Sequence, residues 1–481
     1  MTLVLRNVRP WGGAAVDFAL ADGRIAAMDG NLPRGAAEID GRGAVLLPGL
    51  HDHHLHILAT AARRHSVDLT GLVDAAAVRQ ALIAGQRHGG WVRAVGYDER
   101  AGGLPDAALL DRWLPDTPLR LQDRTGALWA LNSPALALLG DRPLPPGAER
   151  DLDGRLTGRF WREDQWLAAA LPAALPDLAG LGHDLAALGL TGLTDAGANN
   201  GPAEAALLAG KLPQRLVLMG GEALEPGTGY ALGPLKLLID ERAPPVLDVL
   251  AARIGWARRA QRHVAAHCVT EAELALFIAA LDQAGGARAG DRIEHGGMIP
   301  AAFIPVIAEA GLTVVTNPAF IHDRGDRYRA TLDAGQWDDL YRAGSLLAAG
   351  IALRAGSDAP YASIDPWLGM RTARDRLTRA GQPLGPGEAI AAAAALSLYA
   401  HGEIAVGAPA ELILCAGTLA DVLADFGAAA GLPLGAHGER PVGPPADLIL
   451  CAGTLADVLA DFCATRVRAT IIGGAVAFNR D

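Results

Sequence analysis

Residues 47–56 read LPGLHDHHLH, a short apolar strand that ends in a cluster of imidazoles. Because strand side chains alternate between faces, His54 and His56 are expected on one side, one pleat apart. Two neutral imidazoles at the end of a strand suit a divalent metal such as Zn²⁺. His51 and His53 share the opposite face, where packing or support of the site is expected. Taken alone, the segment also fits a solvated loop that happens to be rich in histidine.

Composition limits the function classes. The chain has 481 residues, of which 51% are hydrophobic, enough for one large domain with a smaller one or for two to three average domains. A net charge of −11 argues against nucleic acid and anionic membranes as partners. The four cysteines lack C-x-x-C spacing, and neither a signal-peptide layout nor a membrane-length apolar run is evident. We therefore expect a cytoplasmic protein that acts on a small molecule, with a homodimer as the default assembly.

The two ends of the chain have the same sequence pattern, which predicts short strands separated by Gly- and Asp-containing turns. Residues 1–45 and 401–481 are therefore predicted to form a small composite β-sandwich domain. Within the tail, the 27-residue segment 400–426 recurs as 436–462 with four differences. This near-identity indicates either a recent tandem duplication or an error in the reported sequence. We expect one copy to supply a strand and the other to be surplus.

The middle of the chain, residues 46–400, alternates apolar runs with Ala- and Leu-rich, helix-like segments, the βα pattern of a parallel sheet. Eight strands are expected, near residues 45–56, 119–123, 190–196, 235–239, 263–267, 292–295, 312–317 and 351–357. Eight βα units predict an α/β fold, a (β/α)8 barrel of the TIM type. No G-x-G-x-x-G motif follows the first strand, which weakens the dinucleotide-binding alternative. The long connections around residues 57–189 predict an insertion near the barrel mouth.

Chemistry in such a barrel takes place where the strands end. Lys236 lies in an expected strand, His267 and His295 each end one, and Asp358 follows a Gly-Ser pair. Each has a structural explanation when taken alone, because a lysine can snorkel, a single histidine is commonly structural, and an aspartate often caps a helix. Their coincidence with the histidines of the first strand indicates one shared site.

These features resemble the amidohydrolase superfamily. The resemblance rests on the pattern PGL-x-D-x-H-x-H at residues 48–56, a lysine in the fourth strand, two single histidines and a late Gly-Ser-Asp. The branch that includes N-substituted formamide deformylase-like enzymes is indicated by WVRAVGYDE (91–99), LWALNS (128–133), DGRLTG (153–158), RIEH (292–295) and GSDAP (356–360). The resemblance covers essentially the whole chain except one copy of the repeat, and it says little about the substrate.

The resemblance implies a metal centre with the ligands His54, His56, Lys236, His267, His295 and Asp358. Lys236 would bridge two metals as a CO2-derived carbamate, which requires the neutral amine that burial favours. Asp358 would also shuttle a proton from a metal-activated water to the leaving nitrogen. A ligand set of nitrogen and oxygen alone favours Zn²⁺, with Mn, Fe or Ni as alternatives.

The chain departs from this branch in two places. Ala127 stands where a histidine is common, which puts the typical substrate of the branch in doubt. Lys236 is not followed by Asp-Gly, so one metal fits the sequence as well as two. The candidate substrate contacts are His322, Arg324 and Trp129, each with packing or a solvated loop charge as its structural alternative.

The predicted function is metal-dependent hydrolysis of a non-peptide C–N bond in a small molecule: an N-acyl or formyl amide, or a cyclic amide. Two alternatives stay open. The same metal centre supports hydrolytic deamination at a ring carbon, and a metal-binding barrel could serve as a non-catalytic scaffold or sensor. The presence of Asp358 argues against the scaffold, because metal binding alone needs no proton-handling carboxylate.

Overall fold

The structure is a computed structural model. It describes residues 3–10, 14–29, 32, 34, 37–171, 176–402, 411–416, 447–451, 462–464, 467–473 and 475–480, with the backbone alone for 411–416 and 447–451. The chain forms two compact units: one combines Met1–His56 with Leu178–Asp481, and the other is Ile57–Asp177. Among the described residues, no helix combines the length and apolar composition that crossing a membrane requires.

The first unit contains a barrel of parallel strands that pair in chain order. In the described residues these are β5 (Leu50–Leu55), β12 (Leu190–Asp195), β13 (Arg215–Gly220), β14 (Ala231–Leu237), β15 (Val264–Cys268), β16 (Arg292–His295), β17 (Thr313–Thr316) and β18 (Leu353–Ala355). The segment after β18 returns to β5, because the backbone N–H of Asp358 donates to the carbonyl of His54 at 2.7 Å. The predicted (β/α)8 barrel is confirmed.

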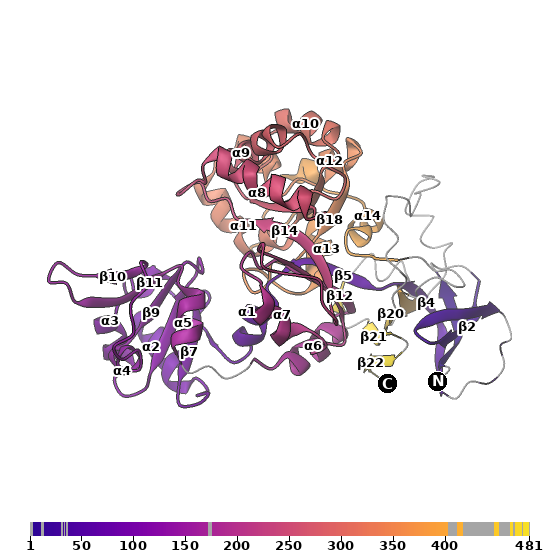
Figure 1. Ribbon diagram of the computed structural model, residues 1–481. Helices are drawn as coiled ribbons and strands as arrows, with labels where there is room; N and C mark the ends of the chain where they lie inside the picture. The colour runs from indigo at the N-terminus through magenta and orange to yellow at the C-terminus, as the bar shows by residue number, and fades with distance from the viewer. Residues whose placement is uncertain are drawn as a thin grey trace. The chain divides into compact units, whose positions relative to one another are not determined.

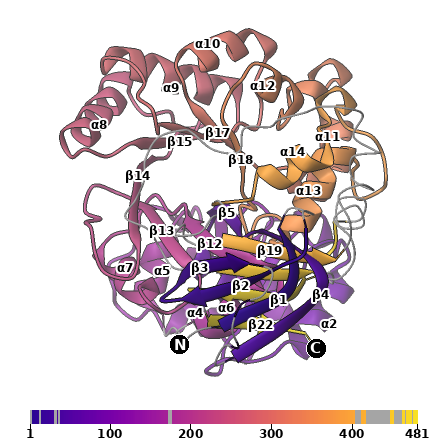
Figure 2. The same cartoon turned by 90° about the vertical axis from the view of Figure 1, so that its right-hand side faces the viewer.

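Helices lie outside these strands, as Figure 2 shows for the part of the barrel from β14 to β18. They are α6 (Leu178–Ala187), α7 (Pro202–Leu208), α8 (Leu247–Arg259), α9 (Glu271–Gln283), α10 (Ile304–Glu309), α11 (Ala319–Thr331), α12 (Gly344–Ala348), α13 (Pro366–Asp375) and α14 (Ala392–Ser397). Strands covered on both faces need apolar side chains throughout, and every residue of β12 is buried.

One predicted barrel strand is wrong. Residues 119–123 form β8 of the other unit, and the third strand of the barrel is β13. The sequence LRLQD in β8 carries polar side chains at alternate positions, the pattern of a strand with only one apolar face. The sequence RLVLMG in β13 has the more continuous apolar run of a covered parallel strand, although its first position is Arg215.

The predicted first strand, residues 45–56, is two strands in two different sheets. β4 (Ala37–Pro48) belongs to the terminal sheet and β5 to the barrel, with Gly49 between them. A Cβ atom at Gly49 would overlap the side chain of Thr191, so a larger residue cannot occupy this crossing point without a shift. The motif that carries the metal-binding pattern thus begins at a junction between sheets.

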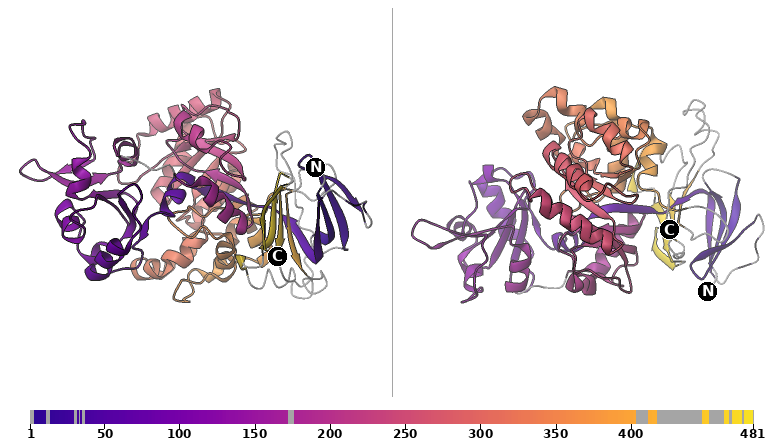
Figure 3. Two further views of the ribbon diagram at one scale, coloured as in Figure 1. Left: turned by 90° about the horizontal axis from the view of Figure 1, so that it is seen from below. Right: turned by 45° about the horizontal axis from the view of Figure 1, so that its top comes forward.

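The terminal sheet takes strands from both ends of the chain, which lie side by side in both views of Figure 3. Its strands are β1 (Leu3–Pro10), β2 (Val16–Ala21), β3 (Arg24–Asp29), β4, β19 (Glu411–Ala416), β20 (Asp447–Cys451), β21 (Val467–Ile472) and β22 (Ala475–Asn479). The order is β22-β21-β20-β19-β4-β1-β2-β3 in the described residues. Its core includes Leu5, Phe18, Ile25, Leu46 and Ile471.

Both copies of the repeat supply a strand to the terminal sheet. The expectation that one copy is surplus is therefore wrong. β19 and β20 are parallel neighbours, with Glu411 opposite its counterpart Asp447. Both also pair with β4, where Leu47 faces Ile413 of one copy and Ile449 of the other. Near-identical sequences have the same register preference, which accounts for the shared partner. Most of the rest of 400–426 and 436–462 lies outside the described residues.

The second unit, Ile57–Asp177, holds its own sheet in the order β10-β11-β9-β8-β7-β6 (Figure 1). Its described elements are α1 (Ile57–Arg63), β6 (Val67–Asp68), α2 (Ala75–Ala84), β7 (Val92–Tyr97), α3 (Ala107–Trp113), β8 (Leu119–Asp123), β9 (Leu128–Leu131), α4 (Ser133–Ala137), β10 (Ala148–Arg150), β11 (Leu156–Trp161) and α5 (Asp164–Ala170). The insertion ends before α6, which belongs to the barrel unit: Gln214 Nε2 donates to the Gly182 carbonyl at 2.7 Å.

Candidate metal centre

His54 and His56 lie at the C-terminal end of β5 and meet one carboxylate. The Nε2 atoms of His54 and His56 lie 3.5 Å and 3.2 Å from Oδ1 of Asp358. The side chain of His54 is 1% exposed, whereas that of His56 is 29% exposed. The two imidazoles therefore share a side of the chain, as strand alternation leads one to expect, and His56 is the more accessible of the pair.

Asp358 is held in place by its backbone. Its φ of +55° lies in the left-handed region, which costs a non-glycine residue on the order of 1 kcal/mol. The hydrogen bond from its backbone N–H to His54 supports this conformation. Burial would raise the pKa of Asp358, but the neighbouring imidazoles of His54, His56 and His295 hold it well below its usual range. The group is therefore a carboxylate, an acceptor of protons or a metal ligand, at neutral pH.

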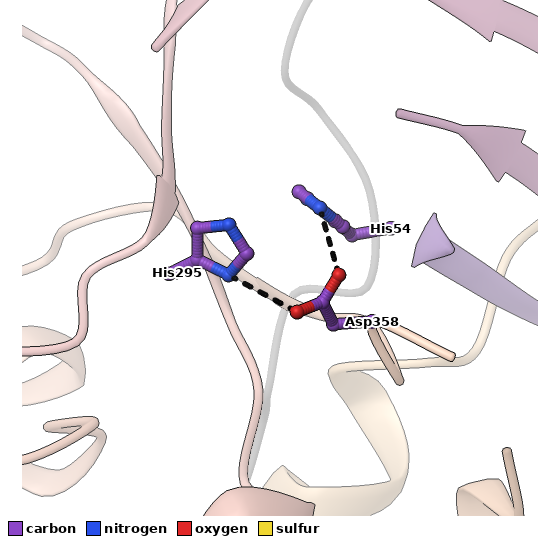
Figure 4. Close-up of side chains that lie close together, drawn as sticks. All are labelled: His54, His295 and Asp358. Carbon is purple, nitrogen blue, oxygen red and sulfur yellow. Dashed lines mark ion pairs between the residues drawn. The ribbon is translucent and has the colours of Figure 1, made fainter. Parts of the chain in front are cut away.

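His295 approaches the same carboxylate from β16. Its Nδ1 lies 3.9 Å from Oδ2 of Asp358, and the two pairs in Figure 4 converge on this side chain. The ring centroid of His295 lies 4.5 Å from those of both His54 and His267. Burial, followed by the charge of Lys236, lowers the pKa of His267 to about 3. A neutral imidazole with a free lone pair is the form that binds a metal.

Lys236 is buried on β14, with 3% exposure. Its Nζ has no hydrogen-bond partner among the described residues. Burial lowers the pKa of Lys236, against the raising effect of the charges of Glu294 and Asp358. A buried amine without a partner is rare, because desolvation of the charged form costs on the order of several kcal/mol unless another group compensates it. The amine is thus a natural position for a further ligand or a covalent modification.

The sequence matches a family model across nearly its whole length. The model of the amidohydrolase family matches residues 37–478. The chain belongs to the amidohydrolase family. This amidohydrolase is 28% identical to the N-substituted formamide deformylase of Arthrobacter pascens, over 82% of this chain and 86% of the relative. It is 24% identical to a putative amidohydrolase of Bacillus subtilis, over 77% and 81%. The predicted resemblance is confirmed.

Solved structures share the fold of this amidohydrolase. An uncharacterized metal-dependent hydrolase from Pyrococcus horikoshii superposes with a TM-score of 0.66 at 18% identity, covering 86% of this chain and 97% of that one. A second, from Pyrococcus furiosus, gives a TM-score of 0.64 at 18% identity, covering 87% and 99%. These structures share the (β/α)8 barrel fold with this chain, and its membership of the amidohydrolase family rests on the match to the family model.

The donor set of this amidohydrolase fits a metal ion. The ligand atoms of His54, His295 and Asp358 all lie within 4.8 Å of one another, and all three residues are buried. Lys236, whose Nζ has no hydrogen-bond partner among the described residues, lies close enough for its charge to contribute to the low pKa of His267. The close group thus contains three of the six predicted ligands.

Sequence reasoning missed several buried polar residues of the site. Asp52 is 1% exposed and accepts hydrogen bonds from the backbone N–H groups of His54 (3.1 Å) and Ser357 (3.0 Å). Burial raises the pKa of Asp52 to about 6. Glu294 and Asn317 contact His54 and His295. Alternation along β5 and β16 could have indicated Asp52 and Glu294, because polar residues there must point into the barrel or lie unsatisfied.

Two of the predicted substrate contacts lie on α11. Nδ1 of His322 lies 2.9 Å from Oδ1 of Asp323. The guanidinium of Arg324 donates to the carbonyl of Tyr361 at 3.0 Å and stacks 4.3 Å above the ring of Phe320. Tyr361 in turn lies with its ring 5.7 Å from that of His56. Arg324 is thus tied to a residue that contacts the candidate ligand His56, and its contact with substrate stays a prediction.

Trp129, the third predicted substrate contact, is buried in the insertion. The residue is 1% exposed, and its indole N–H donates to Oδ1 of Asp164 at 2.6 Å. The guanidinium of Arg120 lies 3.8 Å from the centre of its ring. These contacts favour the packing role of Trp129 over contact with a substrate.

Proposed function

We propose that this amidohydrolase hydrolyses a non-peptide C–N bond of a small molecule, an N-acyl or N-formyl amide or a cyclic amide. The observation that carries the proposal is the buried convergence of His54, His295 and Asp358 at the ends of the barrel strands. The 28% identity to an N-substituted formamide deformylase supports an amide substrate. Barrels of this class carry out their chemistry at this end of the strands, which supports the location.

The residues that would hold the metal are His54, His56, Lys236, His267, His295 and Asp358. Nitrogen and oxygen donors favour Zn²⁺, with Mn, Fe or Ni as alternatives. The buried amine of Lys236, which has no hydrogen-bond partner in the part of the chain that the structure describes, supports a CO2-derived carbamate there if two metals bind. A metal in this position supplies an activated water and polarises the scissile carbonyl.

Asp358 would move the proton. Its pKa, held well below the usual range, leaves it ionised and able to take a proton from the attacking water. Its backbone hydrogen bond to His54 and the two imidazoles on its Oδ1 keep the carboxylate oriented. The same carboxyl group then returns the proton to the leaving nitrogen, so that the amine departs neutral. His322 and Arg324 would contact the substrate beyond the metal ligands.

The test is product analysis after Zn²⁺ reconstitution with bicarbonate. The wild type and Asp358→Asn are incubated with a panel of N-formyl and N-acyl amines and cyclic amides. We expect the wild type to release a carboxylic acid, together with a free amine from the open-chain amides, and the variant to bind metal without turnover. Ammonia without a carboxylic acid would indicate the deaminase instead. Bound metal without turnover across the panel would indicate the non-catalytic scaffold.

We also propose that the protein acts in the cytoplasm on a small-molecule partner, without binding nucleic acid or membranes. The net charge of −11 supports this, since anionic polymers and surfaces would be repelled. A homodimer is proposed on general grounds, because two-fold homo-oligomers are the commonest assemblies of soluble enzymes. Light scattering coupled to gel filtration measures the mass, and a monomer at working concentration would contradict the dimer.

A further inference from the structure

Two buried imidazoles of the candidate metal centre differ in what holds their second nitrogen. Nδ1 of His54 faces Oε2 of Glu294, a carboxylate. Nδ1 of His295 faces Oδ1 of Asn317 at 2.8 Å, a neutral amide. All four residues are buried, with Glu294 and Asn317 at 0% exposure. The two histidines therefore have a charged partner and an uncharged partner in otherwise similar surroundings.

These partners decide which nitrogen of each ring is free. A carboxylate accepts hydrogen bonds, so Nδ1 of His54 carries the proton and Nε2 keeps its lone pair. At Asn317, Nδ2 donates to the carbonyl of Gly356 at 2.9 Å, which directs the amide oxygen towards His295. Nδ1 of His295 must then be the donor as well. Both rings are thereby prepared to offer Nε2 to a metal.

Glu294 has a counter-ion on its own strand, β16. Nε of Arg292 donates to Oε1 of Glu294 at 2.7 Å, and Nη2 of Arg292 donates to the backbone carbonyl of His53 at 2.9 Å. Arg292 and Glu294 lie one pleat apart on the same face of β16, so the strand itself supplies both the carboxylate and its counter-ion.

A carboxylate acceptor makes an imidazole a stronger ligand than an amide acceptor does, because negative charge on one nitrogen's partner increases electron density at the other. Charge-assisted hydrogen bonds are also about twice as strong as neutral ones. We propose that Glu294 is a positioning residue that sets the metal affinity of the centre through His54, and that Asn317 acts through His295 as its weaker, uncharged counterpart. This inference rests on the metal centre of the proposed function.

The test measures metal affinity rather than turnover. Apo protein is titrated with Zn²⁺ in competition with a chromophoric chelator of known affinity, for wild type, Glu294→Gln and Asn317→Ala. Glu294→Gln keeps the shape and removes the charge, and we expect about 10- to 100-fold weaker binding. Asn317→Ala removes a neutral hydrogen bond, and we expect a loss of about fivefold. Equal affinity of Glu294→Gln and wild type would overturn the inference.

A matched control separates charge from general stability. Glu273 is also buried, at 5% exposure, and its carboxylate accepts from the backbone N–H groups of Glu241 and Val269. It contacts none of the candidate ligands in these hydrogen bonds. Glu273→Gln is expected to lower the melting temperature and leave the Zn²⁺ affinity unchanged. Weakening as large as that of Glu294→Gln would mean that any buried carboxylate has this effect, and would contradict the inference.

A variant of opposite sign keeps the inference testable if Glu294→Gln does not fold. Arg292→Gln removes the counter-ion, so the charge of Glu294 acts on His54 with less compensation. We expect its Zn²⁺ affinity to equal or exceed that of wild type, whereas a purely structural role would weaken it. Weakening by tenfold or more would overturn the inference. Failure of the wild type itself to bind Zn²⁺ or Mn²⁺ would instead remove the proposed function.

Discussion

Both faces of β5 carry buried histidines, but the histidines on the two faces have different neighbours. On the inner face, His54 contacts Asp358 and Glu294, and these carboxylates raise its pKa against the opposing effects of burial and Lys236. On the outer face, the rings of His51 and His53 stack 4.4 Å apart, and burial lowers the pKa of both well below the usual value. Among the described residues, Nδ1 of His51 and Nε2 of His53 lack hydrogen-bond partners.

Burial is therefore not what distinguishes a candidate ligand from a packed histidine in this chain. Both groups are buried, at 1% for His54 and 4% for His51. The difference lies in the neighbours: carboxylates orient the inner ring, whereas Thr194, 2.8 Å from Nε2, is the polar partner of His51. A metal site in an apolar barrel is thus defined by the anions that hold the imidazoles in position.

The largest effect is expected from removing the negative charge of Asp358, the carboxylate that the inner-face histidines contact. Asp358→Asn should lower kcat by about 10²- to 10⁴-fold, the usual range for a lost proton-transfer group. The bound metal should stay, because the other five predicted ligands are untouched. Steady-state kinetics with metal analysis on the same sample measure both quantities. Activity near that of wild type would remove the proton-handling role of Asp358.

The second largest effect is expected from one of two matched alanine substitutions at adjacent histidines of β5. His54→Ala should weaken Zn²⁺ binding by at least about 100-fold, more than the loss of a supporting residue costs. His53→Ala deletes the same ring from the outer face and should leave Zn²⁺ affinity unchanged, with a modest loss of stability from the cavity. Chelator competition measures the affinities. Similar losses in both variants would contradict the assignment of the two faces.

Lys236→Ala tests whether the inner face extends to a second metal. If the amine bridges two metals as a carbamate, the variant should hold fewer equivalents of metal per chain than wild type, as measured by mass spectrometry of the digested protein. The structure supports this with a buried Nζ that lacks a partner among the described residues. An unchanged stoichiometry would dismiss the bridging role of Lys236.

The smallest expected effect is the contribution of His51, on the outer face of β5, to the pH dependence of stability. The pKa of His51 is lowered well below 6.5 in the folded state, so the unfolded state binds an extra proton below about pH 6.5. Stability should therefore fall as the pH falls, by up to about 1.4 kcal/mol per pH unit from this residue. His51→Gln should lose less stability than wild type between pH 7.5 and 5.5 in urea unfolding. Parallel losses would show that His51 does not contribute.

The strand assignments show what can be predicted from local pattern. Seven of the eight predicted barrel strands overlap those of the structure, although the first is split at Gly49. The exception, residues 119–123, has a strand pattern and does form a strand, but in the sheet of the insertion. Local alternation indicates that a segment is extended. It does not indicate which strands it pairs with, because pairing depends on contacts far along the chain.

The sequence by itself determined the family, the barrel, and the face of β5 on which His54 and His56 lie, because these depend on motifs and on the two-residue period of a strand. Only the tertiary structure decided that Glu294 holds His54 and that Asn317 holds His295, contacts that span 240 and 22 residues of chain. The physical reason is that a hydrogen-bond partner is chosen by position in space. Closure of the barrel brings side chains of β16 into contact with those of β5. The local sequence of either strand does not predict this contact.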